Sequence, residues 1–160
     1  MSTGDVKILI LETSKKAFKL DINSDHGEKH WNNVEKIGEY LFKKTRADIK
    51  VIKLFARLHD IKRENEDYDI EHGLRASKFI EDLYNKKLLN VTERQLNQLM
   101  FACEHHSNSD IKSDDITIQV CWDADRLDLW RLGIMPDKEL LNTGIAKEDK
   151  SIEFAKKLNL

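Results

Sequence analysis

The 160-residue sequence contains a single proline, Pro136, and only six glycines. Proline and glycine interrupt regular structure and build tight turns, so their scarcity excludes a turn-rich β architecture and favours helices. No apolar stretch approaches the roughly 20 residues that a membrane-spanning helix requires. We therefore expect a helical protein without a membrane partner.

Cysteine is also scarce, because Cys103 and Cys121 are the only two and they form no Cys-x-x-Cys motif. This argues against a disulfide scaffold and favours a reducing compartment. Residues 1–5 lack the basic start of a secretory leader, which makes the cytoplasm the expected location. Neither sign of charge dominates, since the net charge is −2, and we expect no general attraction to nucleic acid polymers.

Apolar residues at helical spacing predict a series of helices along one domain, residues 1–160. Asp48 is expected to cap the second helix, and Thr92 with Gln95 has the spacing of a capping box. The predicted helices cover residues 29–44, 49–58, 70–85, 93–106, 115–132, 137–142 and 146–158.

Two polar stretches, residues 61–69 and 107–114, separate helices and are predicted to be loops. Residues 6–22 fit a short hairpin or a short helix equally well, because short apolar runs do not reveal their period. The sequence therefore predicts an all-α bundle, with a short N-terminal hairpin as one alternative.

Histidines and acids gather at the ends of these predicted helices. Imidazole nitrogens and carboxylate oxygens together suit divalent metal ions, so helix ends that meet would form a metal cavity. Chance clustering is the alternative, since six histidines are not unusual in a chain of this length. The clusters are His26 with His30, His59 with Asp60, Glu104 to His106, and Asp123 with Asp125 and Asp128.

The order His30, His59-Asp60, Asp125 resembles the H…HD…D signature of the HD-domain metal-dependent phosphohydrolase superfamily. His30 opens the segment His-Trp-Asn-Asn-Val, and Asp125 lies in Ala-Asp-Arg-Leu, which are the contexts typical of that signature. The resemblance covers about residues 25–132. It implies an HD-type helical bundle with His30, His59, Asp60 and Asp125 as ligands of a divalent metal ion (Mn, Mg, Fe, Ni, Co or Zn).

The same resemblance implies that metal-activated water hydrolyses a phosphate ester or anhydride of a small metabolite, such as a nucleotide.

Asp123 competes with Asp125 for the last ligand position. The two differ by about 200° around a helix, so both cannot face one site. A solvated acidic face is the alternative for Asp123. Asp128 lies about 60° from Asp125 and is a candidate to orient a ligand.

Further residues are candidates for catalysis and substrate binding. Asp60 is expected to orient the nucleophile, and His72 to act as general acid, oriented by Asp69 three residues earlier. His72 could instead be an exposed histidine behind an aspartate cap. His105 and His106 are candidates for a second metal or for the phosphate, although a helix C-terminus also favours cationic groups. The remaining candidates near the substrate are His26, Arg63, Glu64 and Glu104, together with the basic residues Lys62, Arg75 and Arg126.

One position departs from better-understood branches of the family. HD nucleotidases and guanosine tetraphosphate hydrolases carry an acid three residues after the HD aspartate, where this chain has Arg63. The Gly-Tyr-Pro extension of cyclic-dinucleotide phosphodiesterases is also absent. The sequence therefore leaves open to which substrate branch of the family the chain is similar. It also leaves open whether the chain forms a homo-oligomer. The alternatives to an enzyme are a catalytically silent, metal-containing sensor or interaction domain and a helical interaction protein without metal.

Overall fold

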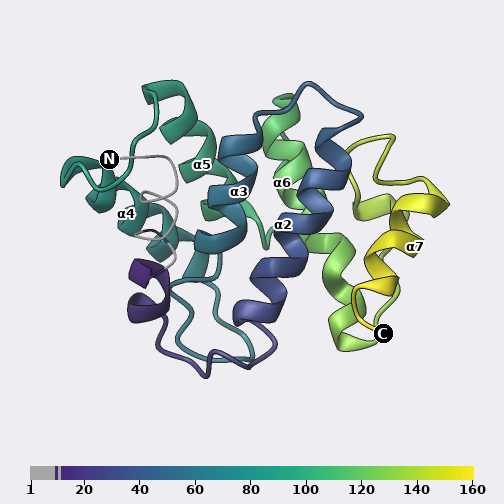
Figure 1. Ribbon diagram of the computed structural model, residues 1–160, viewed down its shortest axis with the longest axis horizontal. Helices are drawn as coiled ribbons and strands as arrows, with labels where there is room; N and C mark the ends of the chain where they lie inside the picture. Colours follow the sequence, from purple (N-terminus) through teal and green to yellow (C-terminus); the bar gives the residue numbers. More distant parts are fainter. Residues whose placement is uncertain (1–9, 11) are drawn as a thin grey trace.

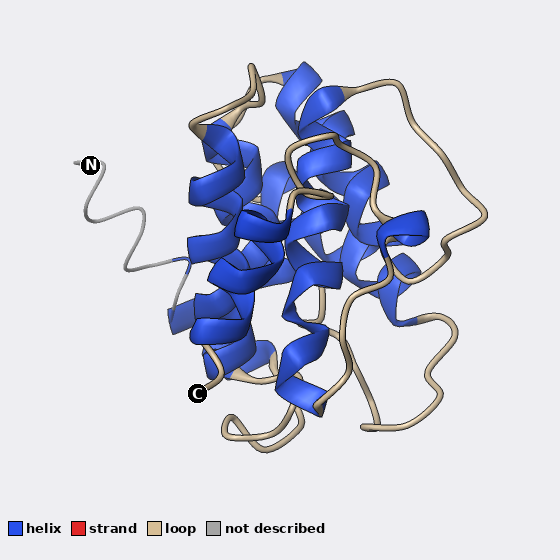
Figure 2. Cartoon of the chain, turned by 90° about the vertical axis from the view of Figure 1, so that its right-hand side faces the viewer, coloured by secondary structure: helices blue, strands red, loops and turns tan. Residues whose placement is uncertain are grey.

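The computed structural model describes residue 10 and residues 12–160, which form helices joined by loops without any strand (Figures 1 and 2). The α-helices are α2 (Glu28–Phe42), α3 (Ile49–Leu58), α4 (His72–Asn85), α5 (Glu93–His105), α6 (Ile116–Leu127) and α7 (Asp149–Lys157). Two 3₁₀ helices are η1 (Asp128–Leu132) and η2 (Lys138–Leu140). The predicted all-α fold is confirmed.

Residues 12–17 are helical, so the described part of the N-terminal region follows the helix alternative and not the hairpin. Residues 6–9 and 11, which belong to the same prediction, lie outside the described residues. The predicted caps are present. The Asp48 carboxylate accepts hydrogen bonds from the backbone N–H groups of Lys50 and Val51, and Thr92 with Gln95 forms a complete capping box.

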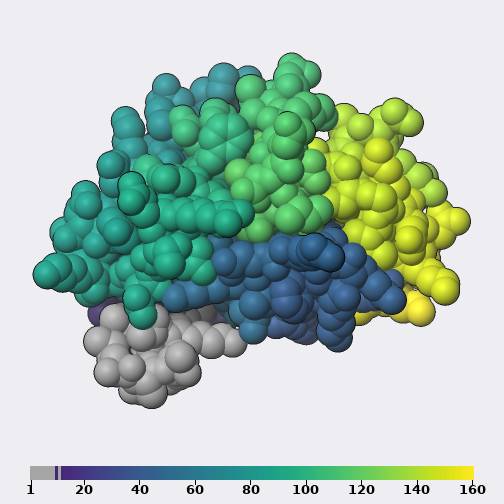
Figure 3. Space-filling view, turned by 90° about the horizontal axis from the view of Figure 1, so that it is seen from above, coloured from purple at the N-terminus to yellow at the C-terminus, as the bar shows by residue number. Residues whose placement is uncertain are grey.

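The helices share one apolar core in which Trp31, Phe55 and Trp122 are completely buried. Helices α2 and α3 pack on each other and on α6, whereas α4 packs mainly on α5. Helix α7 covers α2 at the end of the molecule away from α4 and α5 (Figures 1 and 3). No helix in residues 12–160 combines the length and the apolar character needed to cross a membrane.

Two glycines allow the helices that carry the histidines to approach one another closely. A Cβ atom on Gly38 would lie 2.4 Å from Cγ2 of Ile52, where α2 meets α3. A Cβ atom on Gly73 would lie 2.5 Å from the carbonyl oxygen of Glu104, where α4 meets α5. Any larger side chain would separate these helix pairs, so glycine sets the spacing of the elements that carry His30, His59 and His72.

Candidate metal centre

Four buried histidines have their Nδ1 atoms fixed by oxygen acceptors. Backbone carbonyl and carboxylate oxygens accept hydrogen bonds, so each Nδ1 carries the proton and donates it. The four Nδ1 contacts are His30 with Asp128 Oδ2 (2.6 Å), His59 with the Phe55 carbonyl (3.0 Å), His72 with the Asp69 carbonyl (2.5 Å) and His106 with the Cys103 carbonyl (2.6 Å).

The other ring nitrogen of each histidine, Nε2, therefore presents a lone pair, and these lone pairs face one another in two pairs. His30 Nε2 lies 3.0 Å from His59 Nε2, and His72 Nε2 lies 2.9 Å from His106 Nε2. Two facing lone pairs repel, so each pair requires a cation between its nitrogens, which is either a proton or a metal ion. Buried nitrogens arranged in this way suit a metal site.

Asp60 lies between the two histidine pairs and faces both. Its Oδ2 atom is 3.5 Å from His30 Nε2 and 3.3 Å from His59 Nε2. Its Oδ1 atom is 3.3 Å from the Nε2 atoms of both His72 and His106. One carboxylate therefore reaches two sets of nitrogen donors.

Asp125, which the family resemblance implied as a ligand, joins the first pair. Its Oδ1 atom lies 3.1 Å from His30 Nε2 and 3.4 Å from His59 Nε2. His30, His59 and Asp125 form one group of atoms close enough to hold a metal ion, and His59, Asp60 and His106 form another. Imidazole nitrogens with carboxylate oxygens fit a divalent transition metal.

The electrostatics of the cluster favour a cation. Burial by itself lowers the pKa of His30 and His59, but the facing carboxylates outweigh it and raise these values to about 9 and about 10. Burial likewise raises the pKa of Asp60 and Asp125, but the neighbouring histidines hold both well below their usual range. Two buried carboxylates thus stay anionic and stabilise positive charge between the rings.

A hydrogen-bond network behind His30 includes residues that sequence reasoning did not find. Asp128, which the sequence did offer as a candidate to orient a ligand, is fully buried and accepts from His30 Nδ1 at one oxygen. Its other oxygen accepts from Asn33 Nδ2 at 3.0 Å and from Asn159 Nδ2 at 2.9 Å. Asn33 lies three residues after His30 and therefore on the same helix face, a signal that the sequence contained. Asn159 follows α7, and no local pattern links it to the site.

Asp123, the rival for the last ligand position, is not part of the cluster. Its carboxylate accepts four hydrogen bonds from the backbone and side chains of Asn142 and Thr143. Burial raises its pKa although these four donors oppose the change. The alternative of a solvated acidic face is also wrong, because Asp123 is fully buried and holds the loop before α7.

The structure places several other candidates away from the four Nε2 atoms. His26 Nδ1 lies 2.6 Å from Glu66 Oε2, and its ring centroid is 6.5 Å from that of His30. Glu64 is exposed and lies 3.7 Å from Arg75. The Asp69 carboxylate does not orient His72, because Arg75 occupies it at 2.6 and 2.7 Å and only the Asp69 carbonyl contacts His72.

The basic candidates lie in different parts of the structure. Arg63 Nε lies 3.4 Å from Asp60 Oδ1, beside the cluster. Arg126 donates to the Leu140 carbonyl, and the Lys62 ammonium lies 4.6 Å from the centre of the Phe79 ring. Arg63 is therefore the basic candidate that contacts an acid of the cluster.

A hollow of about 640 Å³ adjoins the cluster at His72. Its lining includes Arg63, His72, Glu104 and His105. His105 is 29% exposed and its Nε2 lies 3.6 Å from a Glu104 oxygen. A small molecule in this hollow would reach the second histidine pair from outside, which makes it the candidate substrate pocket.

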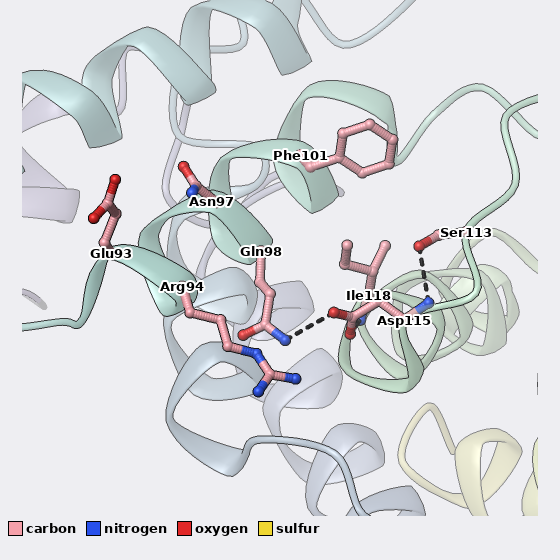
Figure 4. A pocket seen from close by; sticks show the side chains of 8 residues that line it. All are labelled: Glu93, Arg94, Asn97, Gln98, Phe101, Ser113, Asp115 and Ile118. Atoms are coloured by element: carbon pink, nitrogen blue, oxygen red, sulfur yellow. Dashed lines mark hydrogen bonds between the residues drawn. The ribbon is translucent and has the colours of Figure 1, made fainter.

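A different hollow lies between α5 and the start of α6 (Figure 4). Two of its polar side chains already bind each other, because Gln98 Nε2 donates to Asp115 at 2.9 Å, and Asp115 also caps α6. Its lining includes no histidine. We assign no ligand to it.

Comparison with known proteins supports the fold. No protein-family model matches the chain, and no curated protein matches it. A crystal structure of a predicted HD superfamily hydrolase from an uncultured Thermotogales bacterium is similar, with a TM-score of 0.69 and 24% sequence identity. The similarity covers 92% of this chain and 83% of that one, and it confirms the predicted HD-type helical bundle.

Proposed function

We propose that the chain is a metal-dependent phosphohydrolase that cleaves a phosphate ester or anhydride of a small metabolite, such as a nucleotide. The observation that carries the proposal is the pair of facing Nε2 contacts, 3.0 and 2.9 Å apart, on either side of Asp60. The fold supports it, because the similar crystal structure is described as a predicted HD superfamily hydrolase.

In this proposal the cluster holds two divalent ions. His30, His59 and Asp125 would hold one, His72 and His106 the other, and Asp60 reaches both sets. Four imidazoles favour Mn, Fe, Co, Ni or Zn over Mg. Such ions supply a water of lowered pKa and positive charge that offsets the phosphate oxygens.

The remaining chemistry belongs to side chains of the hollow. Arg63, which contacts Asp60 and lines the hollow, would donate hydrogen bonds to a phosphate oxygen of the substrate. We assign the general acid to His105 and not to His72, because His105 is partly exposed in the hollow whereas His72 Nε2 faces His106. His105 would donate its proton to the leaving oxygen of the substrate.

Turnover by metal-loaded protein tests the proposal. Protein reloaded with Mn, Fe, Co, Ni, Zn or Mg is assayed against a panel of nucleotides and other phosphate esters. We expect hydrolysis with at least one metal, lost in Asp60→Asn, which keeps the side-chain volume but removes the charge. The matched control is Asp114→Asn, an exposed position in the loop before α6, which should retain activity. Silence of the whole panel with every metal would contradict the proposal.

A metal-containing sensor is the second candidate, and Arg63 is the observation that favours it. By the family resemblance, nucleotidases carry an acid at that position, whereas here a guanidinium lies beside Asp60. A sensor would show a raised melting temperature with phosphorylated ligands, since a ligand stabilises the state that binds it, but no turnover.

A further inference from the structure

A cluster of basic side chains lies outside the candidate metal centre. A hollow of about 370 Å³ is lined by five side chains that the argument uses, which are Lys19, Lys62, Arg75, Lys78 and Phe79. We call these five residues the basic hollow. The sequence analysis considered Lys62 and Arg75 for the metal site, but the structure gathers them here.

The basic hollow has an excess of positive charge. Two acids also line it, but Asp82 is paired with Lys86 at 2.8 Å, and Glu64 lies 3.7 Å from Arg75. Within the part of the chain that the structure describes, Lys19, Lys62 and Lys78 have no acidic partner. Four cationic side chains against two acidic ones give the lining of the hollow a net positive charge, which would attract a multiply charged anion.

The ring of Phe79 indicates which class of anion the basic hollow suits. Phe79 is half-buried, and the Lys62 ammonium lies 4.6 Å from the centre of its ring. The hollow thus combines phosphate-binding ammonium groups with an apolar, planar surface. We propose that the basic hollow binds a polyphosphate group, either as the free anion or as part of a nucleotide.

The hollow is connected to the metal centre by hydrogen bonds. Arg75 donates twice to the Lys62 carbonyl, at 3.1 Å each, and also binds the Asp69 carboxylate. Asp69 in turn accepts from His72 Nδ1 through its carbonyl, and Lys62 follows Asp60 by two residues. A ligand that draws Lys62 toward itself would shift this series of hydrogen bonds, so the hollow would regulate the metal centre. This regulatory step rests on the proposed function, whereas the binding step does not.

Binding is tested by calorimetry on metal-free protein with pyrophosphate at constant ionic strength. We expect saturable binding that Lys19→Gln/Lys78→Gln weakens about tenfold or more, as two lost charge contacts would. Both lysines are exposed, so folding should persist. The matched control is Lys150→Gln/Lys157→Gln, two exposed lysines of α7, which should bind like wild type. Equal affinity in the two double variants would overturn the site.

ADP separates the two sources of the polyphosphate group. If a nucleotide is the ligand, ADP binds more tightly than pyrophosphate and Phe79→Leu removes the difference. If the free anion is the ligand, ADP gains nothing and Phe79→Leu leaves both affinities equal to wild type.

The connection to the metal centre is tested without any assay of turnover. In metal-free protein, the ¹⁵N imidazole signals of His72 and His106 should shift when pyrophosphate is added to wild type, and should not shift at the same concentration in Lys19→Gln/Lys78→Gln. Binding without any change at His72 would overturn the regulation. A hydrolase that fails in the turnover assay would leave this result unaffected, so the two proposals can fail separately.

Discussion

His72 and His105 lie near the same hollow but have different surroundings, and alanine variants should separate their roles. His72 is buried with its Nε2 atom 2.9 Å from that of His106, so His72→Ala should reduce the metal content by about one ion per chain. His105→Ala should keep the metal and lower kcat by about 10²–10⁴-fold, the usual contribution of a general acid.

Elemental analysis and steady-state kinetics on both variants provide the check. A His72→Ala protein with full metal content and low kcat would restore the sequence-based assignment of His72 as the acid.

Asn159 donates a hydrogen bond to Asp128, and Asp128 accepts one from His30. Removal of the Asn159 side chain should therefore weaken metal binding without removing a ligand. The contacts are 2.9 Å from Asn159 to Asp128 and 2.6 Å from Asp128 to His30. We expect Asn159→Ala to lower metal affinity about 10- to 100-fold, the range typical of residues that orient a ligand. Competition with a chelator measures it.

Lys157→Ala, an exposed change on α7, serves as the control for Asn159→Ala. Unchanged metal affinity, with only a lower melting temperature, would give Asn159 a purely structural role.

Four residues of the candidate site were predictable because their order and contexts resemble the HD signature. His30, His59, Asp60 and Asp125 were expected to converge from their order and contexts, and the structure brings them within a few ångströms of one another. Two features were not predictable. Asn159 reaches Asp128 across 31 residues of sequence, and Asp69 contacts His72 by its carbonyl, which every residue possesses.

At the scale of the elements, the close packing of α4 on α5 places His72 opposite His106. Gly73 permits this, because an added Cβ would meet the Glu104 and Cys103 carbonyl oxygens at 2.5 and 2.6 Å. Gly73→Ala should separate the helices, reduce occupancy of the second ion and cost about 1–3 kcal/mol in the free energy of unfolding.

Gly144→Ala is the control for Gly73→Ala, since nothing lies within 4 Å of a Cβ there. Chemical denaturation and elemental analysis of the two variants test the prediction. Equal stability and equal metal content in both would contradict it.

Helix periodicity predicted the elements well because apolar faces repeat every three to four residues. The helix expected over residues 49–58 begins and ends as predicted. The helix expected over residues 115–132 instead divides into α6 and η1 at Asp128, and the one expected from residue 70 begins at His72. Asp128 accepts a hydrogen bond from His30 at the first of these places, and the Asp69 carbonyl accepts one from His72 at the second. Hydrogen bonds to histidine side chains form at both places, and helix periodicity does not report them.

At the scale of the whole molecule, the cluster joins residues of α2 and α6 with others at the ends of α3, α4 and α5, so metal removal should loosen the bundle. A ligand present at 100 times its Kd adds about 2.7 kcal/mol to the stability of the folded state. We expect a chelator to lower Tm by several degrees and added Mn or Co to restore it. Asp60→Asn should show no such response, and an unchanged Tm in wild type would contradict the prediction.

The most direct test of the metal centre is the metal content of the protein itself. Purified protein is reloaded with Mn, Fe, Co, Ni or Zn, dialysed against metal-free buffer and analysed by mass spectrometry for metal ions per chain. The facing Nε2 pairs on either side of Asp60 predict about two ions per wild-type chain, with a marked loss in Asp60→Asn. Wild-type protein that retains no more metal than Asp60→Asn would show that protons, and not metal ions, lie between these histidines.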